Sequence, residues 1–305
     1  MKALYDVPAP AKLNLFLHVT GRRPDGLHLL ESAFMLIDWC DTLHFELRAG
    51  GALSREDLGE ALPADDLVLR AARALQAAAG TAQGAHIAIE KRVPAQAGLG
   101  GGSSDAATCL LALNRLWNLN FPVAQLARIG LALGADVPFF LGGRNAWVEG
   151  IGERLTPLEL PPARFAVVKP PQGLSTALVF NDPQLKQSVE AAIISGSAAN
   201  RSGEGERDLF GDFRDNPFGS FQVNPFGFGR NDLQPVAQRL CPGVAQALQW
   251  LGSQGLTGRM TGSGTAVFAQ VTQDRALQPA PAGWRVRECG NLEVHPLVGW
   301  APSDD

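Results

Sequence analysis

The sequence is poor in several features, and each shortage excludes a class of protein. Its four cysteines lie far apart, with no CxxC pair and no metal-ligand spacing, as is typical where thiols stay reduced. The net charge of -4 gives no basic field that would draw the chain to nucleic acid or anionic lipid. No run of about 18 apolar residues occurs, and Asp6, two prolines and Lys12 interrupt the N-terminal segment before it reaches signal-peptide length. We therefore expect a cytoplasmic protein that binds neither nucleic acid nor membrane.

What the chain does contain is apolar material for a large core. Of its 305 residues, 46% are hydrophobic and 18% are charged, which suffices for two domains. A linker-like stretch, "ELPPA", lies near residue 160, so we expect an N-terminal domain over residues 1–160 and a C-terminal domain over residues 161–305. Between about 195 and 230 the composition shifts to Gly, Ser, Asn, Asp and Arg, which predicts a surface insertion that is partly ordered at best.

The spacing of apolar residues predicts both strands and helices. Residues 11–19, "AKLNLFLHV", alternate almost strictly, which indicates a half-buried strand. Residues 33–39 and 41–48 predict two further sheet segments. Residues 64–80 carry apolar side chains at helical intervals behind an aspartate cap and stop at a glycine, which predicts a helix. The chain therefore mixes sheet and helix.

The stretch "PAQAGLGGGSSDAA", residues 94–107, has four glycines in five positions. It is not a P-loop, because the chain contains no Gly-Lys dipeptide. It is not a Rossmann loop either, since Ser103 stands where the third glycine belongs and four residues separate Val93 from Gly98. Apolar residues that recur at helical intervals after the two serines predict a serine-capped amphipathic helix from about residue 103.

A glycine arch that runs into a helix start favours an anion. The first amides of a helix are unpaired and carry partial positive charge, and glycines remove the Cβ atoms that would hold a ligand away. We therefore expect phosphate to bind near residues 100–104. The alternative is an ordinary capped helix behind a flexible loop, which explains one serine and one glycine but not the rest.

Two charged residues stand in apolar surroundings. Lys12 shares a strand face with Asn14 and could project into a cleft toward phosphate oxygens, or it could be a harmless lysine on a surface strand. Asp136, in "LALGADVPFFLGG", could be a general base in a poorly solvated pocket, or it could cap a turn ahead of Pro138. His28 follows a turn, where a structural or surface role is the commoner one.

Five ordered motifs carry a resemblance to a known family: "PAPAKLNLFLHVTGRRPDGLHLLES", "PAQAGLGGGSSDAA", "LGADVPFFL", "RNDLQPV" and "RMTGSGTAVFA". Together they resemble the GHMP kinase superfamily over residues 8 to 270, apart from the insertion. The resemblance implies a two-domain α+β fold with the active site in the cleft between domains. It also implies ATP and Mg²⁺ as cofactors. Within the superfamily, the N-terminal motif is most similar to kinases of a cytidine-diphosphate-linked methylerythritol, whose 2-hydroxyl accepts the phosphate. A monomer or homodimer is expected.

The resemblance also implies roles for individual residues. Lys12 and Asp136 match the catalytic positions, and residues 262–264 match a motif that approaches the same phosphates from the second domain. Ser104 is a candidate contact for Mg²⁺ or phosphate, although the metal ligands stay open. The ATP loop comprises Pro94, Ala95, Gln96, Ala97, Gly98, Leu99, Gly100, Gly101, Gly102, Ser103 and Ser104. The substrate-binding positions are Asn14, His28, Thr176 and Phe180.

One departure and three alternatives stay open. Where the family commonly has "DGYH" this chain has "DGLH", so Leu27 replaces an aromatic ring against cytosine, at a cost of about 1 to 3 kcal/mol in stacking. The chain could instead be a GHMP kinase for another small alcohol, such as homoserine or a mevalonate-type acid. It could also be a catalytically silent nucleotide sensor. The third alternative is a nicotinamide oxidoreductase, for which the glycine-rich stretch is the only support.

Overall fold

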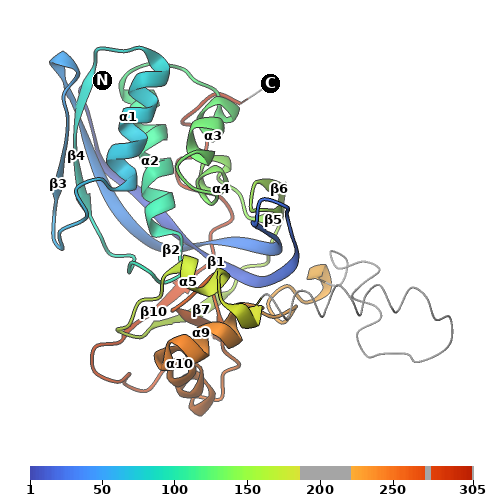
Figure 1. The fold of residues 1–305 in the computed structure, drawn as a ribbon. Coiled ribbons are helices and arrows are strands. Elements are labelled where there is room, and N and C mark those ends of the chain that lie inside the picture. The colour runs from blue at the N-terminus through green and yellow to red at the C-terminus, as the bar shows by residue number, and fades with distance from the viewer. Residues whose placement is uncertain (186–220, 272–275, 304–305) are drawn as a thin grey trace.

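The computed structural model describes residues 1–185, 221–271 and 276–303. These residues form strands, α-helices and one short 3-10 helix, labelled as in Figure 1. In chain order they are β1 (Ala3–Arg22), β2 (His28–Arg48), η1 (Ala49–Gly51), β3 (Leu53–Asp57), α1 (Leu67–Ala79), β4 (Gly84–Glu90), α2 (Gly101–Leu116), α3 (Val123–Leu131), α4 (Val137–Gly142), β5 (Ala146–Gly150), β6 (Arg154–Pro157), β7 (Arg164–Lys169), α5 (Thr176–Phe180), α9 (Gln234–Leu240), α10 (Pro242–Ser253), β8 (Arg259–Met260), β9 (Val267–Val271) and β10 (Arg285–Gly290).

The first sheet is organised around β2. Its path is β3-β4-β2-β5-β6, and β1 pairs antiparallel with β2 outside that path. The two segments predicted over residues 33–48 are parts of this one strand of 21 residues. The strand is long enough to pair with β4 near its end and with β5 near its start. Helices α1 to α4 cover one face of this sheet (Figure 1).

The second sheet has the order β10-β7-β9-β8 and is antiparallel throughout, with α9 and α10 packed beside it (Figure 1). The two sheets share a core rather than standing apart. It includes Leu13, Met35 and Trp147 from the first sheet and Phe165 and Phe268 from the second. Burial of this apolar surface holds the sheets together, and the predicted α+β class is confirmed.

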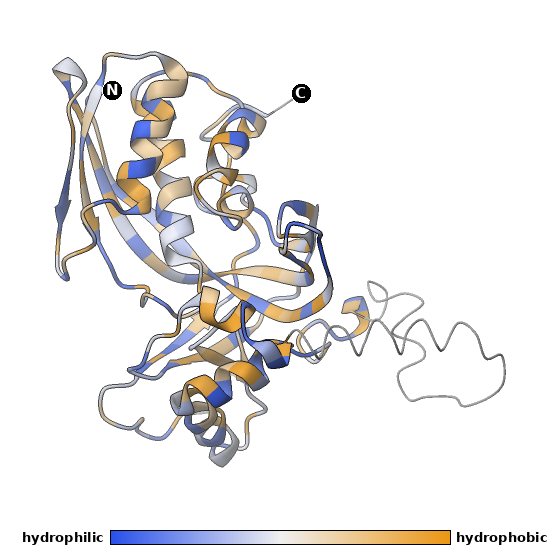
Figure 2. Ribbon diagram, in the orientation of Figure 1, coloured by the Kyte–Doolittle hydropathy of each residue, from blue (hydrophilic) through white to orange (hydrophobic). Residues whose placement is uncertain are grey.

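Helix α1 forms as its sequence predicts. The Asp66 carboxylate accepts a hydrogen bond from the Leu69 amide at 3.1 Å, and Gly80 ends the helix in a left-handed conformation, with φ of 60°. Apolar and polar residues alternate along α1 and α10, as expected of helices with one buried face (Figure 2). Across the described ranges, no helix is both long and apolar enough to cross a membrane.

Helix α2 starts differently from the prediction. It begins two residues before Ser103, and its cap is Gly100, which has φ of 70° and caps no amide through a side chain. Both serines lie inside the helix, so the predicted serine cap is wrong. The helix is not amphipathic either, because the first sheet and helices α1, α3 and α4 surround it and bury most of its residues.

The segment after β10 returns to the first half of the molecule. Asn291 and Val294 form isolated bridges with Ile37 and Arg144, and Leu297 is buried in the core that lies between the first sheet and its helices. The division into domains at residue 160 stays a prediction, and this segment crosses it.

Most of the insertion predicted over residues 195–230 lies outside the described residues, which resume at 221. Phe221 and Phe228 are 1% and 5% exposed. Both rings pack against Phe16 and Trp147 on the first sheet. These two rings belong to the core, whereas most of residues 222–230 are exposed as expected.

Candidate active site

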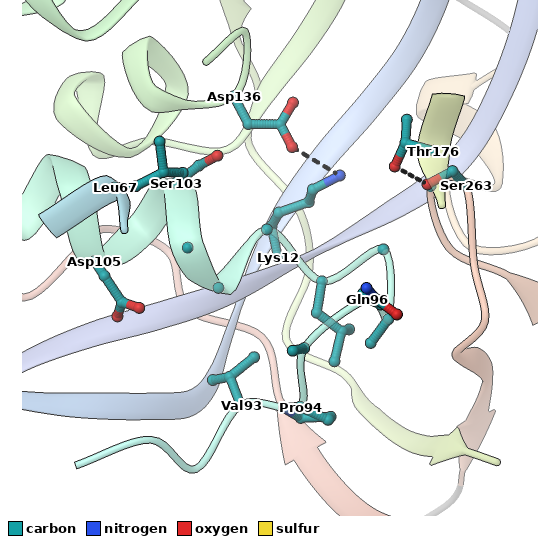
Figure 3. Close-up of a pocket in the computed structure, with 18 of the residues that line it drawn as sticks. Lys12, Leu67, Val93, Pro94, Gln96, Ser103, Asp105, Asp136, Thr176 and Ser263 are labelled. Carbon is teal, nitrogen blue, oxygen red and sulfur yellow. Dashed lines mark hydrogen bonds and ion pairs between the residues drawn. The ribbon is translucent and has the colours of Figure 1, made fainter. Parts of the chain in front are cut away.

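A pocket of about 560 Å³ lies between the first sheet with its helices and the turn between β8 and β9 (Figure 3). Segments far apart in the sequence line it: β1, β2, the glycine loop, the start of α2, the start of α4, α5 and residues 262–264. Of the predicted site residues, the lining includes Lys12, Asn14, Pro94, Ala95, Gln96, Ala97, Gly98, Leu99, Gly100, Gly101, Gly102, Ser103, Asp136, Thr176 and Phe180.

The glycine loop is shaped by close packing against neighbouring chain segments. Gly98 has φ of 72°, and a Cβ there would stand 2.2 Å from the Thr261 carbonyl oxygen. Gly100 has φ of 70°, and its Cβ would meet Phe140 and Lys12 at 3.0 to 3.1 Å. Only glycine satisfies both requirements. At 98 and 100 the missing Cβ atoms make room for neighbouring protein atoms, and both residues also line the pocket.

The amides at the start of α2 do open on the pocket. Gly101, Gly102 and Ser103 precede the first hydrogen bond of the helix, which joins the Ser104 amide to the Gly100 carbonyl at 2.9 Å, and all three line the pocket. A Cβ on Gly102 would meet nothing closer than the Leu67 Cδ1 at 3.4 Å. The positive end of α2 thus faces a cavity that can hold an anion.

Ser104 has a different place. Its side chain is 0% exposed, and its hydroxyl donates to the Pro10 carbonyl at 2.7 Å. This bond ties α2 to β1. The predicted contact between Ser104 and a ligand is therefore wrong, because the hydroxyl is directed into the core.

Lys12 and Asp136 meet across 124 residues of sequence, 136 minus 12 (Figure 3). The Lys12 Nζ lies 3.4 Å from the Asp136 Oδ2, and the side chains are 4% and 29% exposed. Lys12 also lies 4.4 Å from the centre of the Phe34 ring, and its backbone amide donates to Leu99 in the glycine loop at 3.0 Å. Asp136 stands at the cap position of α4 but caps no amide, so the simple capping alternative is not supported.

Of the predicted substrate residues, Asn14, Thr176 and Phe180 line the pocket, Asn14 bonds to Lys12, and His28 is not a lining residue but lies against Phe180. His28 begins β2 and is 9% exposed, and its ring centre lies 5.4 Å from that of Phe180 at an interplanar angle of 37°. Thr176 and Ser263 share a hydrogen bond of 2.7 Å between their hydroxyls, which links α5 to the turn after β8. Leu27, beside His28, is 48% exposed.

Comparisons with known proteins settle the family. Residues 66–144 match the model of the GHMP kinases N terminal domain, and residues 214–280 match that of the GHMP kinases C terminal domain. The chain is 66% identical over 308 aligned positions to the 4-diphosphocytidyl-2-C-methyl-D-erythritol kinase of Variovorax paradoxus, with 99% of this chain and 100% of that protein covered. The chain belongs to the 4-diphosphocytidyl-2-C-methyl-D-erythritol kinase family.

Solved structures agree with this assignment. The kinase superposes on a crystal structure of 4-(cytidine 5'-diphospho)-2C-methyl-D-erythritol kinase with a TM-score of 0.68 and 32% identity, over 93% of this chain and 98% of that one. A homoserine kinase from Cytophaga hutchinsonii gives a TM-score of 0.62 at 16% identity, over 90% of this chain and 86% of that one, and shares the fold alone.

Sequence reasoning missed a buried charge cluster beside the glycine loop of the kinase. Lys91 bridges two carboxylates, Asp41 on β2 and Asp105 on α2. Burial alone would lower the pKa of Lys91, but Asp105 and Asp41 outweigh it and raise that pKa. Burial raises the pKa of the Asp105 carboxyl well above its usual range, against the pull of Lys91 and with a further rise from Asp41.

Asp41 anchors the entry to the loop. Its Oδ1 accepts hydrogen bonds from the amides of Arg92 and Val93 at 2.5 and 2.7 Å, and its side chain is 0% exposed. The cluster therefore fixes both ends of the glycine loop, because Lys91 holds the strand side and Asp105 holds α2. The only sequence signal was the small number of lysines, five in the chain.

The pocket of the kinase also extends past the glycine loop toward the segment before α1. Leu62, Pro63 and Leu67 supply apolar walls there, and Asp65 and Arg70 lie at the same end. The pocket thus has an apolar compartment, a run of helix amides, an ammonium beside a carboxylate and an aromatic end, in that order along the molecule.

Proposed function

We propose that the kinase transfers the γ-phosphoryl group of ATP to the 2-hydroxyl of 4-diphosphocytidyl-2-C-methyl-D-erythritol, giving the 2-phosphate and ADP. ATP is the phosphate donor that membership of this kinase family implies. The observation that carries the proposal is the Lys12–Asp136 pair, 3.4 Å apart in the pocket that the amides at the start of α2 line.

The nucleotide would lie along the glycine loop. The amides of Gly101, Gly102 and Ser103 would hold the phosphates at the positive end of α2. An adenine ring would then reach the apolar walls at Leu62 and Leu67. The transferred group would face Lys12 and Asp136, because these two residues line the same pocket on its other side.

Transfer passes through a loose transition state, so alignment and charge stabilisation supply most of the catalysis. Asp136 would accept the proton of the attacking hydroxyl and orient it. Lys12 would neutralise negative charge on the transferred group. The Lys12 side chain is only 4% exposed, so little water competes for its ammonium and its attraction to negative charge is stronger.

The residues present fit a Mg²⁺ ion, although they do not form a cage for one. In the part of the chain that the structure describes, no group of three His, Cys, Asp or Glu side chains is placed to hold a metal. Mg²⁺ is suited to this setting, because it keeps several waters and binds through one or two protein oxygens plus phosphates. Ser103 is the residue we assign to it, since it carries a hydroxyl at the start of α2 and lines the pocket. When bound, the ion would neutralise charge on the phosphates.

The cytidine end of the substrate would lie by Phe180. The rings of Phe180 and His28 contact each other directly, so a cytosine would stack on the outer face of Phe180 with His28 and Thr176 at its edge. Leu27 would cover the other face of the base with an aliphatic side chain. Asn14 would contact the methylerythritol unit from the wall beside Lys12. A cytoplasmic location and a monomeric or homodimeric state remain predictions.

Substrate choice tests the proposal. Purified protein with ATP and Mg²⁺ is offered the cytidine diphosphate compound, homoserine or mevalonate, and ADP release is followed together with the phosphorus spectrum of the product. We expect ADP and a new phosphomonoester with the first compound alone. Turnover of homoserine or mevalonate at a comparable rate would support a kinase of another alcohol. ATP binding without ADP release in any mixture would support a sensor.

A further inference from the structure

A chain of hydrogen bonds runs from the backbone of β1 to the Lys12 ammonium. The Ser32 hydroxyl donates to the Phe16 carbonyl, the Asn14 Nδ2 donates to the Ser32 Oγ at 3.0 Å, and the Lys12 Nζ donates to the Asn14 Oδ1. Lys12, Asn14 and Ser32 are 3%, 1% and 1% exposed. Water therefore competes little for any of these bonds, and the chain holds a single arrangement.

The direction of every bond follows from the chemistry at the two ends. A carbonyl oxygen only accepts, so the one hydrogen of Ser32 goes to Phe16, and the Ser32 oxygen is left as an acceptor. The amide group that can donate to it is the NH₂ of Asn14. This turns the Asn14 oxygen toward Lys12, which has donors only.

The Ser32 hydroxyl and the Lys12 ammonium favour the same one of the two orientations of the Asn14 amide, and Ser32 is the partner that holds its NH₂ end. An amide turned by half a rotation has nearly the same shape, and only its hydrogen-bond partners choose between the two orientations. In the reversed orientation an NH₂ group would face the ammonium, so Lys12 would lose its acceptor and be repelled. The backbone of Asn14 is held independently, because its amide donates to the Thr261 Oγ1 at 2.8 Å.

The bond from Asn14 sets the direction of the ammonium. One hydrogen of the Lys12 Nζ goes to Asn14, and the Asp136 carboxylate lies 3.4 Å away on another side. The Phe34 ring covers a further side at 4.4 Å. The remaining direction is the pocket, where the phosphates would lie.

We infer that Ser32 is a positioning residue for phosphoryl transfer: its hydroxyl fixes the Asn14 amide, which aims the Lys12 ammonium at Asp136 and at the transferred phosphate. The kinetic consequence of this inference rests on the proposed function. The orientation of Asn14 does not, and it can be measured without turnover.

The kinetic test compares three single variants with the unmodified kinase. Ser32→Ala removes the hydroxyl, and Ser32→Thr keeps it on a residue type that suits a strand. Thr108→Val is the matched control, because the Thr108 hydroxyl is also buried and donates to a β1 carbonyl, that of Pro8 at 3.5 Å. We expect Ser32→Ala to lower kcat by about 10- to 100-fold, the effect of misplacing a catalytic group by about 1 Å. We expect KM for ATP to change less than about twofold and Ser32→Thr and Thr108→Val to keep kcat.

The activity-independent test uses the scarcity of lysine. With five lysines in the chain, ¹³Cε-labelled lysine gives a spectrum in which each signal can be followed, and Lys12→Arg identifies the signal of Lys12. We expect that signal to move in Ser32→Ala and to stay in Ser32→Thr and Thr108→Val. Unchanged signals from the other lysines show in the same spectrum that Ser32→Ala is folded.

Two results would overturn the inference. One is a Lys12 signal that does not move in folded Ser32→Ala. The other is a kcat for Ser32→Ala within about twofold of the unmodified kinase, or a fall in kcat that Thr108→Val reproduces. If the unmodified protein does not phosphorylate the cytidine diphosphate compound, the proposed function fails instead, and the lysine spectra still decide whether Ser32 orients Asn14.

Discussion

Replacing Lys91 with methionine should destabilise the kinase strongly, because it leaves two carboxylates without their shared cation. The ammonium bridges Asp41 and Asp105, whose side chains are 0% and 4% exposed, while Lys91 itself is 15% exposed. Breaking a buried ion pair from one side costs about 3 to 5 kcal/mol, since the remaining charge stays desolvated. Methionine keeps the length and apolar stem of lysine, so the loss reports the charge rather than a cavity.

The cost should depend on which member of the cluster is removed. Asp105→Asn leaves a balanced Asp41–Lys91 pair and removes a carboxyl whose pKa burial has already raised. We expect this variant to change the free energy of unfolding by less than about 1 kcal/mol, since removing a charge that is costly to bury is often neutral. The double variant Lys91→Met/Asp105→Asn should recover part of the stability that Lys91→Met loses, because one uncompensated charge is gone.

Urea unfolding at pH 7.5 measures these differences. We expect the midpoint of Lys91→Met to fall by about 1 to 2 M and that of Asp105→Asn to stay within about 0.5 M. Lys91 has a raised pKa, so its stabilising contribution is fully present below its ordinary pKa of 10.5 and is lost as pH rises through the folded value. The reasoning would be refuted if Lys91→Met unfolded at the same urea concentration as the unmodified protein.

Three further outcomes follow from single positions. Leu27→Tyr should lower KM for the cytidine substrate at least about fivefold and leave KM for ATP unchanged, because it restores about 1 kcal/mol or more of stacking; equal KM values for the substrate would count against a base at this site. Gly98→Ala should abolish ATP binding or folding, since its Cβ would stand 2.2 Å from the Thr261 oxygen. Gly102→Ala has 3.4 Å of clearance and should fold with unchanged thermal stability. Equal melting temperatures for the two variants would contradict this prediction. Burial lowers the pKa of His295 to about 4, so its contribution to the free energy of unfolding is fully present above pH 6.5 and is lost as pH falls. We expect the free energy of unfolding to fall by about 2 kcal/mol from pH 7 to pH 5, and His295→Asn to flatten this slope. Identical pH profiles for the two proteins would reject the assignment.

Local patterns were enough to predict the elements that carry the site. The alternation in residues 11–19 placed Lys12 and Asn14 on one strand, although the prediction of a half-buried strand was wrong because both faces are covered. The aspartate and glycine around α1 marked both of its ends. These features depend on neighbours in the sequence, so the sequence alone contains them. The start of α2 was predicted wrongly because serine caps are common. In the structure Gly100 stands at the cap position, and the Ser104 hydroxyl donates its hydrogen bond to a carbonyl of β1.

What could not be predicted depends on contacts between distant segments. Lys91 stands in the run "EKR" at a strand end, where a solvated charge is the ordinary expectation, and its two carboxylates come from β2 and α2. Ser32 gave no signal at all, because its role lies in a bond to Asn14 that only the pairing of β1 with β2 creates. The pairing of Lys12 with Asp136 was expected from the family resemblance, since spacing alone left a surface lysine and a turn cap open.

The most direct test of the central claim is turnover and nucleotide binding measured on the same samples of Asp136→Asn and Lys12→Ala. We expect each variant to lose at least about two orders of magnitude in kcat with the cytidine diphosphate substrate, as is typical when a general base or a charge partner is removed. ATP should still bind to both, because the amides at the start of α2 are untouched. Near-normal turnover in both variants would contradict the claim that this ion pair performs the phosphoryl transfer.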